Sequence, residues 1–237
     1  MQRYILDDTT NNFYKTDIHH IKKVMRMQTG DKVIVCLHEK CSLVKLNIDE
    51  NITFDVIENY DENKTLDITL VQGLLKGTKI ETTIKYSTIF GAKKIVLVPF
   101  ERSIAKNKNT DNKTDRYFLI AKEAAELAHR EKIPTIEFQD SLKTINWKEY
   151  DYVILADEEE KKTLLKDLEL KNIFDKKIAI IIGPEGGISD NERKYCKNNK
   201  FFSISLGKYI FPAEIAAISI LNNFNSWFFW QLNNYNI

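Results

Sequence analysis

From residue 68 onward the chain alternates short apolar runs with longer amphipathic segments, and this pattern restricts the fold more than any other feature. The short runs are rich in β-branched residues and predict strands at 94–98, 135–138, 152–156, 178–182 and 202–206. The segments between them predict helices at 80–90, 115–130, 160–168 and 190–198, and a long apolar helix from Ala213. Strands that alternate with helices form a mainly parallel sheet with helices on both faces, so the sequence predicts an α/β fold.

The first 70 residues have a different pattern, dominated by short β-branched runs. They predict strands at 33–37, 42–48, 52–57 and 66–71, with a polar turn at 59–63. One early helix is expected, with Asp17 as its N-cap and Ile18 and Ile21 on its apolar face. We therefore expect a small barrel with one helix at residues 1–70, followed by the α/β domain at residues 71–237.

Three of the chain's eight glycines lie within five residues, in the segment IGPEGGIS at 182–189. A buried strand enters this segment and a helix leaves it, with Ser189 or Asp190 as the N-cap. Glycine allows a positive φ and a close approach of the backbone to a ligand. Because ligands bind where parallel strands end at their carboxyl edge, the segment predicts a binding loop. A plain strand-to-helix turn is the alternative. The spacing matches neither a dinucleotide fingerprint nor a P-loop.

A second loop follows in the segment LGKYIFPAEIAA at 206–217. A strand ends at Leu206, and a helix with small residues in its first turns begins after a short loop. Pro212 suits the start of that helix, and the Glu214 carboxylate is favourable in its first turn. Taken by itself, this segment is a capped helix that packs on a sheet.

The three cysteines, Cys36, Cys41 and Cys196, are an odd number without a CxxC pair. They are expected to be reduced thiols in a cytosolic protein, and neither a disulfide framework nor a zinc site is predicted. No Cys or carboxylate stands at metal-ligand spacing near His19 and His20, so no metal is expected. No apolar run reaches the ~18 residues of a membrane span, so no membrane partner is expected.

Positive charge is concentrated in the middle of a chain whose net charge is only +1. Residues 71–135 carry 13 basic and 7 acidic side chains, whereas residues 1–70 are net −3 and residues 136–237 are net −2. A basic patch on a neutral protein is a candidate surface for RNA phosphates, and a solvated lysine-rich face is the alternative.

The two loops together resemble the signature loops of one family of SPOUT methyltransferases, which methylates N3 of a uridine in bacterial 16S ribosomal RNA. GPEGGIS at 183–189 and LGKYIFPAEIAA at 206–217 carry the resemblance most specifically. HHIKKVMRM at 19–27, KGTK at 76–79 and FERS at 100–103 extend it in collinear order over nearly the whole chain.

This resemblance implies an amino-terminal PUA-like β-barrel that helps to bind RNA, and a carboxyl-terminal SPOUT domain with a deep trefoil knot. It further implies a cytoplasmic homodimer, and the apolar tail at 218–230 with its four consecutive aromatic residues is the expected dimer contact. The methyl donor S-adenosyl-L-methionine would bind among the knot loops. The cofactor-binding residues are then Leu155, Ile182, Gly183, Pro184, Glu185, Gly186, Gly187, Leu206, Gly207, Ile210, Phe211 and Ala213.

Glu214 and Lys208 are the candidate catalytic residues, because the uridine N3 must lose a proton and a cation would stabilise the anion. The family usually has Arg at the position of Tyr209, Arg or Lys at Pro212, and Thr at Ile215. Lys208 is the nearest remaining cation in this loop. The candidate contacts to ribosomal RNA are Arg3, Arg26, Arg102, Lys106 and Arg130.

Two alternatives to a 16S rRNA uridine-N3 methyltransferase stay open at this stage. The chain could be a SPOUT methyltransferase that acts on another RNA site. It could also be a non-catalytic RNA-binding relative, because the usual arginines are replaced at Tyr209 and Pro212.

Overall fold

A computed structural model describes residues 1–61, 65–105, 111–170 and 173–235, without the side chains of 111, 112 and 227–235. The chain forms two compact units. Unit 1 contains Met1–Lys64 and Lys122–Ile133, and unit 2 contains Thr65–Ala121 and Pro134–Ile237.

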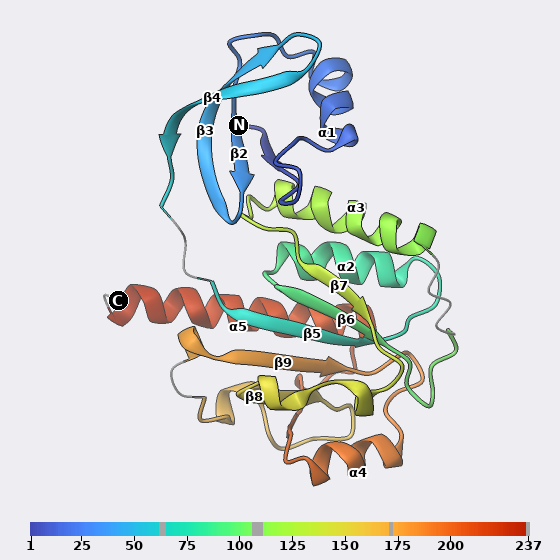
Figure 1. Ribbon diagram of the computed structural model, residues 1–237. Coiled ribbons are helices and arrows are strands. Elements are labelled where there is room, and N and C mark those ends of the chain that lie inside the picture. The colour runs from blue at the N-terminus through green and yellow to red at the C-terminus, as the bar shows by residue number, and fades with distance from the viewer. Residues whose placement is uncertain (62–64, 106–110, 171–172, 236–237) are drawn as a thin grey trace. The chain divides into compact units, whose positions relative to one another are not determined.

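Unit 2 is built on a six-stranded parallel sheet in the order β10-β8-β9-β5-β6-β7 (Figure 1). Its strands are β5 (Asp67–Gly73), β6 (Lys94–Val98), β7 (Thr135–Phe138), β8 (Tyr152–Ala156), β9 (Lys177–Ile182) and β10 (Phe202–Ile204). The β9 strand lies between β8 and β5, and Ile182 is in register with both Ala156 and Gln72. This position explains its run of buried apolar residues, because a central parallel strand is covered on both faces. The predicted parallel sheet is confirmed.

Helices cover both faces of this sheet, as predicted. On one face α2 (Lys79–Ile89) packs against α5 (Ala213–Tyr235), which also contacts β9 (Figure 1). On the other face, Val71, Leu155 and Ile181 pack with Cys196 of α4 (Asp190–Asn198). The remaining helix, α3 (Asp111–Leu127), stacks its Tyr117 ring on Phe138 of β7 within unit 2.

The helix predicted at 160–168 is wrong. The described chain has only a short 3-10 turn there, η4 (Leu165–Asp167). The Glu160 carboxylate accepts hydrogen bonds from the backbone N–H groups of Lys162 and Thr163, at 2.7 and 3.1 Å. Leu164 then forms a parallel bridge to Ser205, and the Ser205 N–H donates to the Thr163 carbonyl at 2.7 Å. Pairing with the chain after β10 thus holds this segment extended, where a helix would lose those bonds.

Unit 1 contains a four-stranded sheet in the order β1-β2-β3-β4. The strands are β1 (Arg3–Ile5), β2 (Lys32–Leu37), β3 (Lys40–Ile48) and β4 (Ile52–Asn59). The β1 strand pairs in parallel with β2, and the other neighbours are antiparallel. Its core includes Tyr4, Ile21 and Val44, all buried. Sequence patterns predicted β2, β3 and β4 but missed the three-residue β1.

The early helix begins before the predicted N-cap, so that prediction is wrong. The α1 helix spans Lys15–His19 with Tyr14 as its N-cap, and a π-helical segment, η1, continues over His20–Val24. Asp17 is the third helical residue, and its carboxylate accepts the Tyr14 N–H at 3.1 Å. This carboxylate is buried in an ion pair with Lys122, which also pairs with Glu126. A tertiary ion pair therefore occupies the side chain that local sequence assigns to a cap.

The compact units differ from the domains predicted at residues 1–70 and 71–237. The β5 strand begins at Asp67 and pairs with β6 and β9, so it belongs to unit 2. Residues Lys122–Ile133 group with unit 1, where Ala125 packs against Ile5 and Ile34. The Glu126 carboxylate accepts the Ile5 N–H at 2.9 Å, which ties this segment to β1. A domain boundary at one position of the sequence therefore cannot separate the two units.

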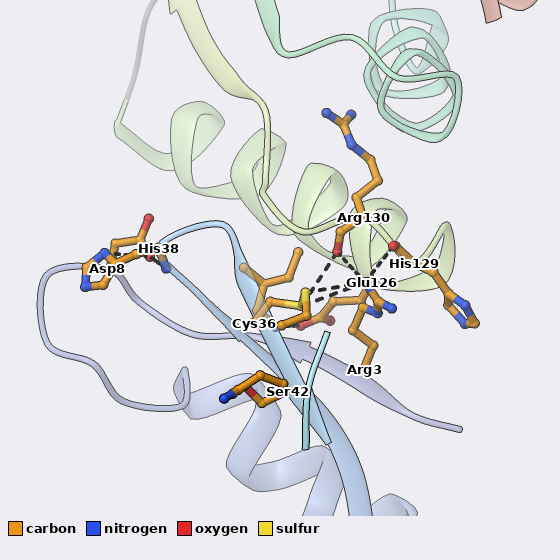
Figure 2. The surroundings of a disulfide bond; sticks show 11 residues. Arg3, Asp8, Cys36, His38, Ser42, Glu126, His129 and Arg130 are labelled. Carbon is orange, nitrogen blue, oxygen red and sulfur yellow. Dashed lines mark hydrogen bonds and ion pairs between the residues drawn. A yellow bond between two sulfur atoms is a disulfide. The ribbon is translucent and has the colours of Figure 1, made fainter. Parts of the chain in front are cut away.

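Cys36 and Cys41 form a disulfide, which contradicts the prediction that all three cysteines are reduced (Figure 2). They face each other across the β2–β3 hairpin with Cα atoms 4.0 Å apart. The turn residues His38 and Glu39 have φ of 49° and 64°, the backbone of a two-residue type I′ turn. That turn fixes the register that opposes the two cysteines, and the CxxC criterion does not detect such a pair. Cys196 is free and buried, and burial raises the pKa of its thiol to about 12.

Thiol titration tests this disulfide. Purified without reductant, the folded protein is expected to show no thiol that reacts with Ellman's reagent, because Cys196 is buried with a raised pKa. After denaturation without reductant, one thiol per chain should react, and three should react after reduction. Three reactive thiols in the unreduced, denatured protein would restore the original prediction.

Candidate functional site

A cavity of about 570 Å³ opens in unit 2 where β8 and β9 end. Three segments surround it: the chain after β8, the glycine loop after β9, and the loop between β10 and α5. Its volume lies within the ~300–1,000 Å³ of small-molecule sites. Because these ends are the carboxyl edge of a parallel sheet, the cavity stands where α/β folds bind ligands.

The glycine loop runs from the end of β9 to the start of α4. Ser189 is the N-cap of α4: its Oγ accepts the Glu192 N–H at 3.2 Å, and the Glu192 carboxylate accepts the Ser189 N–H at 2.8 Å. This capping box confirms one of the two predicted N-caps. A turn closed by the Gly187 N–H and the Pro184 carbonyl, at 2.9 Å, precedes it. The loop therefore has a fixed shape between two regular elements.

Two of its glycines are required for different reasons. Gly187 has φ +76°, a conformation that favours glycine. Gly186 has no positive φ, but a Cβ there would lie 2.6 Å from the Arg102 carbonyl oxygen. The expectation of positive φ thus holds at Gly187 and fails at Gly186, where close packing decides. Arg102 packs closely against the loop at Gly186, and the loop lines the cavity.

A cluster of acidic side chains after β8 supports the same loop. The Glu158 carboxylate accepts the Ile188 N–H at 3.0 Å and an N–H of Arg193 at 2.8 Å. The Arg193 Nε also donates to both oxygens of Asp157 at 3.1 Å. Asp157 and Glu158 line the cavity, so Arg193 of α4 neutralises its acidic wall and braces the loop. Sequence reasoning missed this brace because no local pattern pairs Asp157 and Glu158 with Arg193, which lies far along the chain.

The loop between β10 and α5 forms the third wall. Gly207 has φ +123°, and its N–H donates to the Ser205 Oγ at 3.3 Å. Tyr209 and Ile210 line the cavity, and they are 71% and 68% exposed. Lys208 does not line the cavity, and its Nζ lies 5.8 Å from the Tyr209 ring centroid. The role of Lys208 as a catalytic residue stays a prediction.

The first turns of α2 and α5, together with the glycine loop, place three charged side chains at one end of the cavity. The Lys79 Nζ lies 3.3 Å from a Glu214 oxygen and 3.8 Å from a Glu185 oxygen. That Glu185 oxygen also accepts the Lys76 N–H at 3.1 Å. Lys79 and Glu185 line the cavity, whereas Glu214 lies behind them with one carboxylate oxygen buried and without a partner among the described residues. The sequence indicated Lys79 only as part of the KGTK segment that resembles the family, and did not predict it as a site residue.

Of the predicted cofactor residues, all but one line the cavity. These are Ile182, Gly183, Pro184, Glu185, Gly186, Gly187, Leu206, Gly207, Ile210, Phe211 and Ala213. Leu155 does not, because it is buried in the core of the sheet, and its neighbour Ala156 lines the cavity instead.

The candidate RNA contacts that the structure describes are divided between the two units. Arg102 is exposed beside the glycine loop in unit 2, whereas Arg26 is exposed in unit 1. Arg3 is engaged within unit 1, where it donates to the carbonyl groups of His129 and Arg130 at 2.6 and 3.3 Å (Figure 2). Lys106 lies outside the described residues.

Comparison with known proteins identifies the family. The RNA methyltransferase domain matches residues 61–225, and the PUA domain of RNA methyltransferases matches residues 13–40. The chain belongs to the RNA methyltransferase domain family. The RNA methyltransferase domain therefore has a SPOUT-type fold, and a PUA-like domain precedes it, as the resemblance implied.

Relatives and solved structures agree with this assignment. The RNA methyltransferase is 30% identical to ribosomal RNA small subunit methyltransferase E of Bacillus subtilis, over 94% of this chain and 95% of the relative. It is 27% identical to the protein of that name from Mesomycoplasma hyopneumoniae, over 93% and 97%. The crystal structure of ribosomal RNA small subunit methyltransferase E from Neisseria gonorrhoeae bound to S-adenosyl methionine shares the fold, with a TM-score of 0.80 and 20% identity, over 96% and 98%.

Two solved structures that share this fold, from Legionella pneumophila and Neisseria gonorrhoeae, contain bound S-adenosyl methionine. The cavity fits this group. Its lining combines glycine and apolar residues of the glycine loop and of the loop after β10, whose side chains leave the main chain accessible to an adenine ring, with charged side chains that suit the polar end of the donor. Among the described residues, no group of three or more His, Cys, Asp or Glu could hold a metal ion. No helix in the described part of the chain is long and apolar enough to cross a membrane.

Proposed function

We propose that this RNA methyltransferase transfers a methyl group from S-adenosyl-L-methionine to N3 of one uridine in 16S ribosomal RNA. The observation that carries the proposal is that both signature loops line one cavity at the carboxyl ends of β8 and β9, through residues 183–187, 206–207 and 209–213. The names of the Bacillus and Mesomycoplasma relatives, which span nearly the whole chain, support the small-subunit RNA as substrate.

The bound donor would supply a methyl group on a positively charged sulfur. The residues of the chain align this group with the acceptor and exclude water, which are the main requirements of an in-line displacement. Contacts with Glu158 and Arg102 hold the glycine loop. The uridine N3 must also lose its proton, and a nearby cation favours the anion.

The replaced arginines leave few cations at this site. Tyr209 and Pro212 line the cavity where the family usually has basic residues. Among the described lining residues, Lys79 and Lys161 are the cations. A non-catalytic relative would still bind the donor but would not transfer its methyl group. Incubation with radiolabelled donor and unmodified small ribosomal subunits separates the two: we expect transfer to one uridine N3, and donor binding without transfer would favour the non-catalytic alternative.

We also propose that unit 2 contains the trefoil knot of its family, and that the protein is a cytoplasmic homodimer. The apolar stretch of α5 supports the dimer, although the side chains of its last part lie outside the described residues. Light scattering at micromolar concentration is expected to give about twice the chain mass of 27.7 kDa. A mass equal to one chain would contradict the dimer.

RNA binding is proposed to involve the basic middle of the chain together with Arg26. Replacing Arg102 and Lys106 with Ala should weaken binding to small-subunit RNA, because phosphate contacts release counterions. The salt slope of the affinity should flatten by about one to two units. Donor affinity should change little, because the Arg102 carbonyl and Cβ that touch Gly186 remain in the variant.

Lys194 and Lys197 of α4 offer a matched control for this double variant. Both are exposed and lie in the net-negative last part of the chain. Replacing them with Ala removes the same charge and should leave the salt slope unchanged. Equal slopes for the parent and the Arg102/Lys106 variant would show that the patch is a solvated face.

A further inference from the structure

We infer that Lys79, Glu185 and Glu214 form the subsite for the amino-acid end of the methyl donor, which carries one ammonium and one carboxylate group. The inference rests on the donor named in the proposed function and deepens it. Lys79 supplies the cation for the carboxylate, and Glu185 supplies an anion for the ammonium group. Glu214 acts behind Lys79 as a positioning residue.

Unused hydrogen-bond donors and acceptors at this end of the cavity support the assignment. Lys79 has three N–H donors, and its two carboxylate contacts at 3.3 and 3.8 Å leave it able to bind a further acceptor. Its side chain is 43% exposed, so a ligand can reach it. One Glu214 oxygen is buried without a hydrogen-bond partner among the described residues. A site that keeps spare donors and acceptors is suited to a ligand that offers both.

Charge balance at the same end also fits a zwitterion. The three side chains sum to −1, and the helix α5 begins at Ala213 beside Glu214. Helix α2 begins at Lys79, and its N-cap Thr78 makes no side-chain hydrogen bond. Each helix N-terminus contributes roughly +0.5 charge, so the local sum is about zero. A neutral site with separated charges favours a ligand of the same kind over a net anion or cation.

The end of the cavity formed by the chain after β8 is less suited to this role. Both Asp157 oxygens accept from Arg193, and the Glu158 carboxylate accepts from Arg193 and the Ile188 N–H. Lys161 donates to the backbone carbonyl of Glu158. The charged groups at that end are thus committed to bracing the loop.

Truncated ligands test the inference by calorimetry. S-adenosylhomocysteine keeps the amino-acid end, and 5′-methylthioadenosine lacks it. Lys79→Met should weaken binding of S-adenosylmethionine and S-adenosylhomocysteine by about tenfold to a hundredfold, the effect of losing a charge-assisted hydrogen bond. The affinity for 5′-methylthioadenosine should change by no more than about twofold. This ligand lacks the amino-acid end, so it has no contact with Lys79 to lose. Lys79→Arg should recover part of the loss.

Lys85→Met is the matched control, because Lys85 is an exposed lysine of the same helix that does not line the cavity. It should leave all three affinities unchanged. Equal weakening of all three ligands by Lys79→Met would show that Lys79 only shapes the loop, and no weakening would remove it from the donor site. Either outcome overturns the inference. Because the test uses no RNA, failure of the proposed rRNA methylation would appear separately.

Discussion

Gly186→Val is expected to abolish binding of S-adenosylmethionine while the protein remains folded. A Cβ at Gly186 would lie 2.6 Å from the Arg102 carbonyl oxygen and 3.0 Å from the Arg102 Cβ. Backbone atoms cannot move aside cheaply, so the loop must shift toward the cavity that it lines. A branched side chain adds further crowding. Calorimetry should detect no binding at donor concentrations that saturate the parent protein.

Gly77→Ala is the control for a general loss of stability. Gly77 has φ +63° but no atom within 4 Å of a built Cβ, and it does not line the cavity. This variant should lose about 1 kcal/mol of unfolding free energy from backbone strain and bind the donor as the parent does. If a folded Gly186→Val protein binds the donor with parental affinity, the glycine loop is not the donor site.

Arg193→Met should lower the free energy of unfolding by about 3 kcal/mol, the size expected when one partner of a buried ion pair is removed. Asp157, which accepts the Arg193 Nε with both oxygens, has only 8% of its side chain exposed and would lose its charge partner. Glu158 and Glu159 are more exposed and contribute less. Denaturant unfolding followed by circular dichroism measures the change.

The same variant should weaken donor binding, because Arg193 holds the Glu158 carboxylate that accepts the Ile188 N–H. Lys194→Met is the comparison, since Lys194 is the next residue of α4 and is exposed. It should change the unfolding free energy by less than about 0.5 kcal/mol. An Arg193→Met protein as stable as the Lys194→Met protein would contradict the proposed brace.

The sequence predicted those parts of unit 2 whose local pattern and tertiary role agree. The β9 strand is apolar on both faces because it is central, and the Ser189 capping box fixes the start of α4. Both are encoded within a few neighbouring residues. The glycine loop between them was therefore located correctly. The need for glycine at position 186, however, comes from packing against Arg102 and not from the backbone conformation.

Three of the failures share one physical cause, which is contact between residues far apart in the sequence. The run at 160–168 is helical in composition, yet it pairs with Ser205. Asp17 resembles an N-cap, yet Lys122 neutralises it. Lys79 joins the site only because α2 and α5 begin close together. The missed disulfide has a local cause instead, because Cys36 and Cys41 are brought together by the register that the turn at 38–39 fixes.

The central claim is methylation of one uridine N3 in 16S ribosomal RNA, and mass mapping of that RNA tests it most directly. RNA from a strain that lacks this protein should lack one methyl group on a single uridine, and the parent protein should restore it. The Gly186→Val protein, expressed to the same level, should not restore it. Identical 16S RNA in the parent and deletion strains, or a missing methyl group in another RNA, would contradict the claim.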